Sequence, residues 1–444
     1  MPLVWGKEVD FEYIVHLLGD ELVKLIRKEP GGWCVNLLRE VQPEDLIRVK
    51  EYGQFIIDIR IDLTALDHLC PDLMDLKNTS KLFPILRNIT FKSSKTSAYG
   101  IPKPSQFSHL LTETLCSIRG ENLLTDLLDD FLVTVEKRSA SRLTHFSYSH
   151  DLGLPGGLNG VARLIQQCPE LRSISLYATT KAFKWNVVEA CMSRPHLKRL
   201  HLEGDPPPWP RSITKEQWAL SLESFTFRSP LPSCVVAYLQ HLDSNILVNL
   251  EVSCMAPAAH QPFLHVDRFT NLRSVTLKDF GTWGSDGVWG DCLPFLACHQ
   301  MRSFRIYVRY QHGGAPYPVN DEALFQLAQA WPFLELLQIE PYDPNLTSLP
   351  TMRGLRSLAR FCPELRFLII SVHASDGDGD AHHHPETLIH KSPSFPSTKL
   401  EGLQISGTIG NMSAEEVAVA LSELWPMAVA RVDTRLTRMD GVGS

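Results

Sequence analysis

A run of aspartates and histidines near the C-terminal end has the residue types that suit metal chemistry best. The segment DGDGDAHHHPETLIH at 376–390 contains seven aspartates and histidines that can ligate zinc or nickel ions: Asp376, Asp378, Asp380, His382, His383, His384 and His390. A structural metal site needs ligands that a second shell holds in place, and the loop-like stretch at 374–397 supplies none. The residues therefore favour a solvated loop and no resident metal, with weak metal binding by residues 376–390 left as an open alternative.

Other motifs that would carry enzymatic chemistry are missing from the sequence. It contains no G-x-x-x-x-G-K-[ST] or G-x-G-x-x-G loop to hold phosphates. It also lacks the G-x-S-x-G turn that presents a nucleophilic serine. The ten cysteines form no C-x-x-C pair, which predicts reduced thiols that pack as small apolar residues. We therefore expect a protein that is not an enzyme and that binds no cofactor.

The charge balance limits the kinds of partner. Lys and Arg number 43 and Asp and Glu number 50, which gives a net charge of −7 and argues against a non-specific nucleic-acid binder. No apolar run approaches the roughly 18–20 residues that span a bilayer, and the first residues lack the order of a signal peptide. The expectation is an intracellular protein, cytoplasmic or nuclear, that binds neither nucleic acid nor membrane.

A short apolar phrase recurs along the chain and would position any binding residues. Its first, fourth and sixth residues are apolar, as in LRSISL from Leu171 and LRSVTL from Leu272. The phrase begins at eleven positions: Leu86, Leu143, Leu171, Leu197, Leu222, Leu247, Leu272, Met301, Leu334, Leu365 and Leu400. After a first step of 57 residues, the steps range from 25 to 35, close to the period of leucine-rich repeats.

Each phrase alternates with period 2, which predicts a short strand with one buried face. Between the phrases, apolar residues recur at helical spacing, as at Val161, Leu164, Ile165 and Cys168. Prolines then end three of these helices, at Pro169, Pro332 and Pro363, and we expect the same at Pro195. One strand, together with the helix that leads the chain back to the start of the next strand, forms one coil of the repeat. The repeating pattern predicts that these coils stack into an α/β leucine-rich-repeat solenoid, with a parallel sheet on the concave face and helices on the convex face.

Some segments depart from the repeat. Residues 1–80 are expected to form a helical cap and linker, with an amphipathic helix over 11–28 that EPGG at 29–32 ends. The solenoid is expected over 81–435. A mostly helical insertion at about 101–139 fills the first, long step, so one coil there would lack a clean strand. The loop at about 374–397 interrupts the last coils.

The junction at residues 41–63 resembles a known family. VQPEDLIRVKEYGQFIIDIRIDL, followed by LFPILRNITF, is similar to the linker and first repeat of fungal F-box/leucine-rich-repeat proteins, and CPEL at 168–171 and 362–365 is similar to a phrase of their repeats. The resemblance implies the substrate-recognition part of a ubiquitin-ligase receptor, with a Skp-type adaptor of a cullin–RING ligase as partner. Residues 1–40 lack the L-P-x-E phrase that opens an F-box. We therefore expect weak adaptor binding or none, and a repeat interaction protein or inhibitor without a ligase link is the alternative.

Alternation within each phrase places its third, fifth and seventh residues on the concave face. The earlier coils carry small polar and charged residues there, whereas the later coils bring together Arg305, Tyr307, Leu336, Phe367 and Ile369. Aromatic residues and arginine are enriched at the centres of protein interfaces. These five residues are the predicted protein-binding face. The opposing interpretation is that the chain's own segment 425–444 or the 374–397 loop covers them.

Overall fold

The structure is a computed structural model, and the residues it describes fall into two compact units. The units comprise Met1–Pro207 with Thr214–Leu222, and Pro208–Ile213 with Glu223–Ser444. The described residues are 9–18, 21, 23–28, 32–37, 42–63, 82–93, 103–111, 114–123, 125–150, 158–182, 184–205, 221–229, 232–242, 246–254, 263, 265–280, 292–308, 319–341, 349–374, 400–409 and 414–425.

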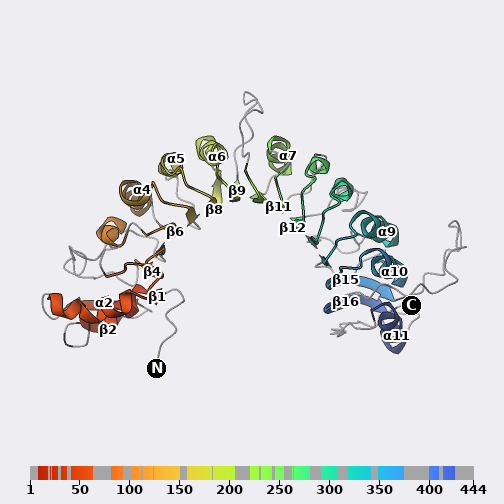
Figure 1. Cartoon of the computed structure of the whole chain (residues 1–444), viewed down its shortest axis with the longest axis horizontal. Coiled ribbons are helices and arrows are strands. Elements are labelled where there is room, and N and C mark those ends of the chain that lie inside the picture. The colour runs from red at the N-terminus through yellow and green to blue at the C-terminus, as the bar shows by residue number, and fades with distance from the viewer. Residues whose placement is uncertain are drawn as a thin grey trace, which may run out of the picture. The chain divides into compact units, whose positions relative to one another are not determined.

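The first unit contains a parallel sheet whose strand order follows the chain order. Its strands are β1 (Val9–Asp10), β4 (Asp58–Asp62), β5 (Asn88–Lys92), β6 (Ser117–Glu121), β7 (His145–His150), β8 (Ser173–Ala182) and β9 (Arg199–Asp205). Its helices are α1 (Phe11–His16), η1 (Pro43–Leu46), α2 (Ile47–Gly53), η3 (Pro104–Leu110), α4 (Thr125–Ser139), α5 (Leu158–Gln167) and α6 (Trp185–Met192). Helices α4 to α6 lie on the outer side of the sheet, so β6 to β9 line the inner side (Figure 1).

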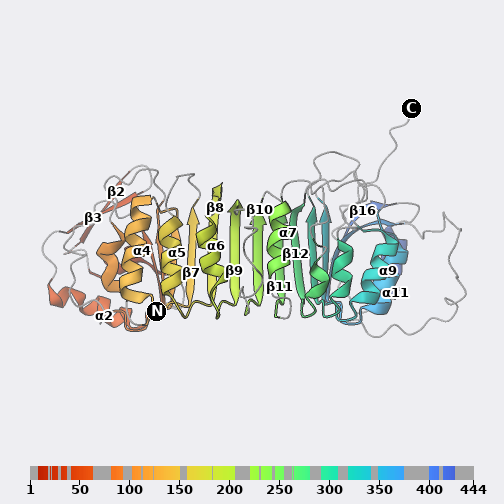
Figure 2. The same ribbon diagram turned by 90° about the horizontal axis from the view of Figure 1, so that it is seen from above.

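The second unit repeats this arrangement. Its strands are β10 (Ser224–Ser229), β11 (Asn249–Cys254), β12 (Ser274–Phe280), β13 (Ser303–Val308), β14 (Leu336–Pro341), β15 (Phe367–Ala374) and β16 (Gly402–Ile409). Its helices are α7 (Pro232–His241), η4 (Val266–Arg268), η5 (Leu293–Ala297), α9 (Asp321–Ala330), α10 (Met352–Phe361) and α11 (Ala414–Leu424). Strand arrows within each unit point the same way (Figure 2). This α/β architecture of parallel strands with returning helices is compatible with a solenoid.

Every one of the eleven apolar phrases lies on a strand, as predicted. Each strand begins at the third residue of its phrase, and equivalent residues pair across neighbouring strands. Ser274 is paired with Ser303, for example, and Leu336 with Phe367. The first residue of the phrase lies in the core: Leu272 and Leu365 are both 0% exposed. The repeat spacing therefore sets both the strand register and the composition of the core.

The helix ends also agree with the sequence. Helices α5, α9 and α10 end two residues before Pro169, Pro332 and Pro363, and α6 ends three residues before Pro195. A proline cannot donate the backbone hydrogen bond that would extend a helix, so the chain leaves each helix there and enters the next strand.

Contacts between successive coils hold the helices in line. The side chain of Asp321, in the first turn of α9, accepts hydrogen bonds from the backbone nitrogens of Thr351 (2.7 Å) and Gly354 (3.0 Å), at the start of α10. Its other oxygen accepts a bond from the Thr351 hydroxyl, also at 2.7 Å. A Cβ on Gly354 would lie 2.6 Å from the Asp321 oxygen, so a larger residue there would have to displace the carboxylate. One coil thus caps the helix of the next.

The predicted helix over 11–28 is wrong. Helix α1 stops at His16, and β2 (Val23–Lys28) forms an antiparallel pair with β3 (Gly32–Leu37). The apolar residues of 23–28 fit either period over so short a stretch, and pairing with a partner strand decided the outcome. The EPGG motif follows β2, and its last residue, Gly32, begins β3, so the motif does not end a helix. Strands β1 and β4 also place the start of the sheet upstream of residue 81, the predicted start of the solenoid.

The coil predicted to lack a strand within 101–139 has one. Strand β6 lies in register between β5 and β7, on a phrase that begins at Leu115 and continues through Ile118 to Gly120. Glycine at the sixth position hid the pattern. A Cβ there would meet the side chains of Leu123 at 3.1 Å, Tyr148 at 3.3 Å and Phe131 at 3.4 Å, so neighbouring side chains fill the space. The long step of 57 residues therefore divides into steps of 29 and 28.

Candidate functional site

The five residues of the predicted binding face all lie on β13, β14 and β15 of the second unit. Strand pairing places Leu336 directly beside Phe367, and Phe367 beside Gly402. The Phe367 ring covers Gly402, because a Cβ on that glycine would lie 2.9 Å from Cδ1 of the ring. The guanidinium of Arg366 lies 5.8 Å from the ring centre. Phe367 is nevertheless 41% exposed, so an aromatic surface faces outward at this point of the sheet.

A second row of residues crosses the same strands two positions further on. It runs from Arg305 through Gln338 and Ile369 to Gln404. Ile369 lies two residues beyond Phe367 on the same strand, next to the row formed by Leu336 and Phe367. Within its own row, Gln338 lies between Ile369 and Arg305. The structure thus divides the predicted face into an apolar part, formed by Leu336, Phe367 and Ile369, and a polar part formed by Arg305 and Tyr307. The sequence did not reveal this division, because register decides which residues are neighbours.

Arg305, in the polar part of the face, has a hydrogen-bond donor that no acceptor meets among the residues that the structure describes. Its Nε atom is buried and has no hydrogen-bond partner within the described part of the chain. The acidic residues that strand register places near Arg305 already bind other side chains. Glu251 binds Lys278 at 2.6 Å, and Glu340 accepts a hydrogen bond from Gln338 at 2.8 Å. A buried donor without an acceptor costs about 1–3 kcal/mol, so the position of Arg305 lowers the stability of the fold rather than adding to it.

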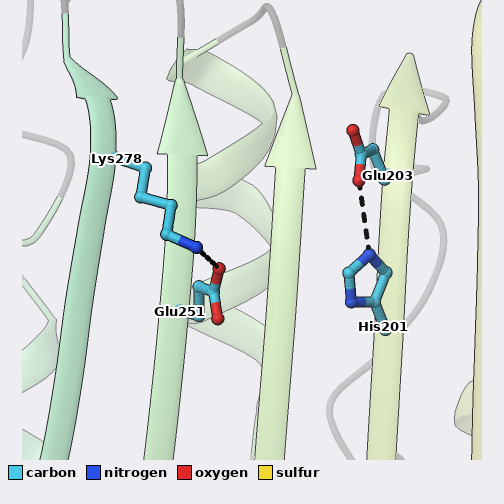
Figure 3. Close-up of polar contacts among 4 residues, drawn as sticks. All are labelled: His201, Glu203, Glu251 and Lys278. Atoms are coloured by element: carbon cyan, nitrogen blue, oxygen red, sulfur yellow. Dashed lines mark hydrogen bonds and ion pairs between the residues drawn. The ribbon is translucent and has the colours of Figure 1, made fainter. Parts of the chain in front are cut away.

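Polar pairs occupy the corresponding positions elsewhere. Lys278 on β12 reaches across to Glu251 on β11, on the face that carries the predicted site (Figure 3). In the first unit, His201 Nε2 lies 3.5 Å from a Glu203 oxygen on the same strand, as Figure 3 also shows. There too, Glu121 pairs with Arg119 at 2.8 Å and with Arg60 at 4.0 Å. The exposed Phe367 ring on β15 and the half-buried Leu336 and Ile369 beside it contrast with these paired polar side chains.

Seven cysteine side chains that the structure describes are free thiols, and all of them except Cys116 are buried: Cys116, Cys168, Cys191, Cys234, Cys292, Cys298 and Cys362. Burial raises the pKa of the Cys168, Cys191, Cys298 and Cys362 thiols to about 12. A thiol attacks or binds metal as its thiolate, so these four are inert at neutral pH and serve the core. This agrees with the packing role expected from their positions in the repeat.

The aspartate and histidine run at 376–390 lies outside the described residues. So do the segments expected to cover the binding face, except Ala374, which ends β15, and Trp425, which is buried. Among the residues that the structure describes, no group of three or more His, Cys, Asp or Glu side chains could hold a metal ion. No helix in the same residues has the length and apolar character to cross a membrane.

No family model matches the chain, and a search of the curated proteins found no match.

Proposed function

We propose that the chain is a non-enzymatic protein-binding scaffold of the leucine-rich-repeat type, which holds a protein partner on the inner face of the second unit. The observation that carries the proposal is the exposed Phe367 ring beside Leu336 and Ile369, on a sheet face where polar residues would serve stability better. Stacked parallel strands in shared register support the repeat type, because each coil contributes one residue to every row.

The polar part of the face indicates how a partner would be oriented. Arg305 offers a guanidinium whose Nε finds no acceptor in the described residues, next to Tyr307 on the same strand. A partner that places an apolar side chain against Phe367 and a carboxylate at Arg305 would satisfy both parts. Buried aromatic and arginine contacts of this kind supply most of the energy in protein interfaces.

Two versions of the proposal differ in the link to ubiquitin transfer. The resemblance of residues 41–63 and of the CPEL phrases favours the substrate-recognition part of an F-box/leucine-rich-repeat receptor. The lack of an L-P-x-E phrase in residues 1–40 favours a scaffold or inhibitor without that link. We expect little or no complex when the 1–444 chain is mixed with a purified Skp-type adaptor and passed over a sizing column. A stoichiometric complex would contradict this expectation and support the receptor.

Phe367→Asp tests the binding face itself. Since the Phe367 side chain is 41% exposed, the new charge stays in water, and the melting temperature should change little. Partners recovered by crosslinking and mass spectrometry from native cells should be lost. Ser274→Asp is the matched control, because it adds the same charge at the equivalent position of β12, away from the apolar part.

Two results would count against this face. A Phe367→Asp protein that keeps its stability and its full set of partners would exclude Phe367 from binding. A large loss of stability instead would support the opposing interpretation, in which another segment of the chain covers the ring.

A further inference from the structure

Three cationic or ionisable residues meet at the N-terminal edge of β7, β8 and β9 in the first unit. They are His145 on β7, Arg172 just before β8, and Arg199 at the start of β9. Backbone hydrogen bonds place them side by side. The nitrogen of Arg172 donates to the Thr144 oxygen at 2.9 Å, and that of Arg199 donates to the Arg172 oxygen, also at 2.9 Å. All three side chains are exposed.

Glutamate side chains neutralise three arginines that lie elsewhere in this unit. Arg60 and Arg119 pair with Glu121, and Arg163 pairs with Glu136 at 3.0 Å. Arg172 and Arg199 form no ion pair with any residue that the structure describes. The edge therefore presents two guanidiniums that are open to an external anion.

The pKa of the His145 imidazole depends on the charges around it. Partial burial lowers the pKa of His145, and the charges of Arg199 and Arg172 lower it further. The residues that adjoin it from β6 are Cys116 and Ser117, neither of which carries a charge that offsets the arginines. The field at the ring is thus positive and unbalanced.

A hydrogen-bond chain fixes how the ring takes up a proton. The Thr144 hydroxyl donates its hydrogen to the Cys116 oxygen at 3.0 Å. It can then only accept from Nδ1 of His145, which lies 2.8 Å away, so the neutral ring carries its proton on Nδ1. Nε2 is left to gain a proton and to donate a second hydrogen bond when an anion arrives.

We propose that this basic edge, formed by His145, Arg172 and Arg199, binds an acidic segment of a protein partner through a carboxylate or phosphate group. The guanidiniums hold the anionic group, and His145 adds a charged donor. A long polyanion fits less well, because Glu121 and Glu203 lie further along strands of the same sheet and the chain carries a net charge of −7. The site lies in the first unit and does not depend on the function proposed for the second.

The test uses the full chain, labelled with ¹³C at histidine Cε1, and three synthetic peptides of one length. One peptide is rich in glutamate, one carries phosphoserine and one is neutral. His145 is assigned with His145→Gln, and its pKa is followed by NMR with and without peptide, while fluorescence anisotropy gives affinities.

Anionic groups near the ring favour the protonated form, so the glutamate or phosphoserine peptide should raise the pKa of His145. Its binding should tighten as the pH falls through that pKa. The glutamate and phosphoserine arms separate the two sources of the anion, since a carboxylate site binds both peptides and a phosphate site prefers the second. The neutral peptide should change nothing.

Arg172→Met with Arg199→Met should weaken acidic-peptide binding at least about tenfold, the loss expected for two charge-assisted contacts. The free double variant should also show a higher pKa for His145 than the unmodified chain. Arg163→Met, which removes a paired arginine on α5, is the matched control and should leave both readouts unchanged.

Three outcomes would overturn the proposal. The acidic and neutral peptides could act alike, the double variant could keep the peptide-induced rise in the His145 pKa, or a single-stranded RNA oligonucleotide could bind more tightly than either acidic peptide. The third outcome would assign the edge to nucleic acid instead.

Discussion

Trp331→Ala should lower the free energy of unfolding by about 3–5 kcal/mol, the range for removing a buried tryptophan. The side chain is 0% exposed, and its ring centre lies 4.7 Å from that of Phe304 on β13. Its Nε1 donates to the Phe295 oxygen at 3.2 Å, and its own carbonyl lies 3.6 Å from the Cys362 sulfur. Loss of the ring therefore opens a cavity where three successive coils meet.

Urea unfolding of the purified chain measures this effect. Phe333→Ala is the matched control, since Phe333 lies two residues further along the chain and is 47% exposed. We expect the control to lose under about 1 kcal/mol, as surface changes usually do. Similar losses in the two variants would contradict the central position assigned to Trp331.

Leu365→Ala should cost about 2–5 kcal/mol, because it removes most of a fully buried leucine at the first position of its phrase. In a stacked array each coil contacts mainly its neighbours, so the damage should stay local. Hydrogen exchange should therefore speed up in β14, β15 and β16 and remain unchanged in the first unit.

Arg366→Ala provides the comparison for this variant. Arg366 follows Leu365 directly but is exposed, and it pairs with Glu401 at 2.6 Å. Exposed ion pairs contribute about 0–1 kcal/mol, so this change should barely alter stability. Uniform acceleration of exchange through both units after Leu365→Ala would contradict the expected neighbour-limited response.

Because the repeat is regular, most of the fold could be predicted from the sequence. A period-2 phrase returning every 25 to 35 residues determined which segments pair, which residue starts each strand and which leucines are buried. Two segments could not be predicted, because their apolar pattern is too short or is interrupted. In β6, Gly120 stands where the phrase has an apolar residue. The apolar residues of β2 fit the helix period and the strand period equally well, and only the pairing with β3 decides between them.

The candidate sites were harder to predict from the sequence, because they depend on which side chains of neighbouring strands lie beside each residue. The outward positions of Leu336, Phe367 and Ile369 followed from alternation alone. The unsatisfied Nε of Arg305 did not, since it depends on Glu251 and Glu340 binding other side chains.

The basic edge of the first unit was missed for a related reason. His145, Arg172 and Arg199 belong to three different phrases, and Arg172 stands at the second position, which alternation does not assign to the concave face. Aligning the second and third positions of successive phrases would have placed these residues together.

The strict pairing of equivalent residues has a consequence for how such a protein changes through insertions and deletions. Between β10 and β12 the phrases recur every 25 residues, and each residue of one strand faces its equivalent on the next. Gain or loss of a whole period leaves every side chain on its original face of the sheet. An insertion of one residue inside a strand turns all the following side chains of that strand over, so that leucines face water and charges face the core. The array can therefore lengthen or shorten in whole coils, each adding or removing one residue from every row, whereas changes within a strand are confined to substitutions.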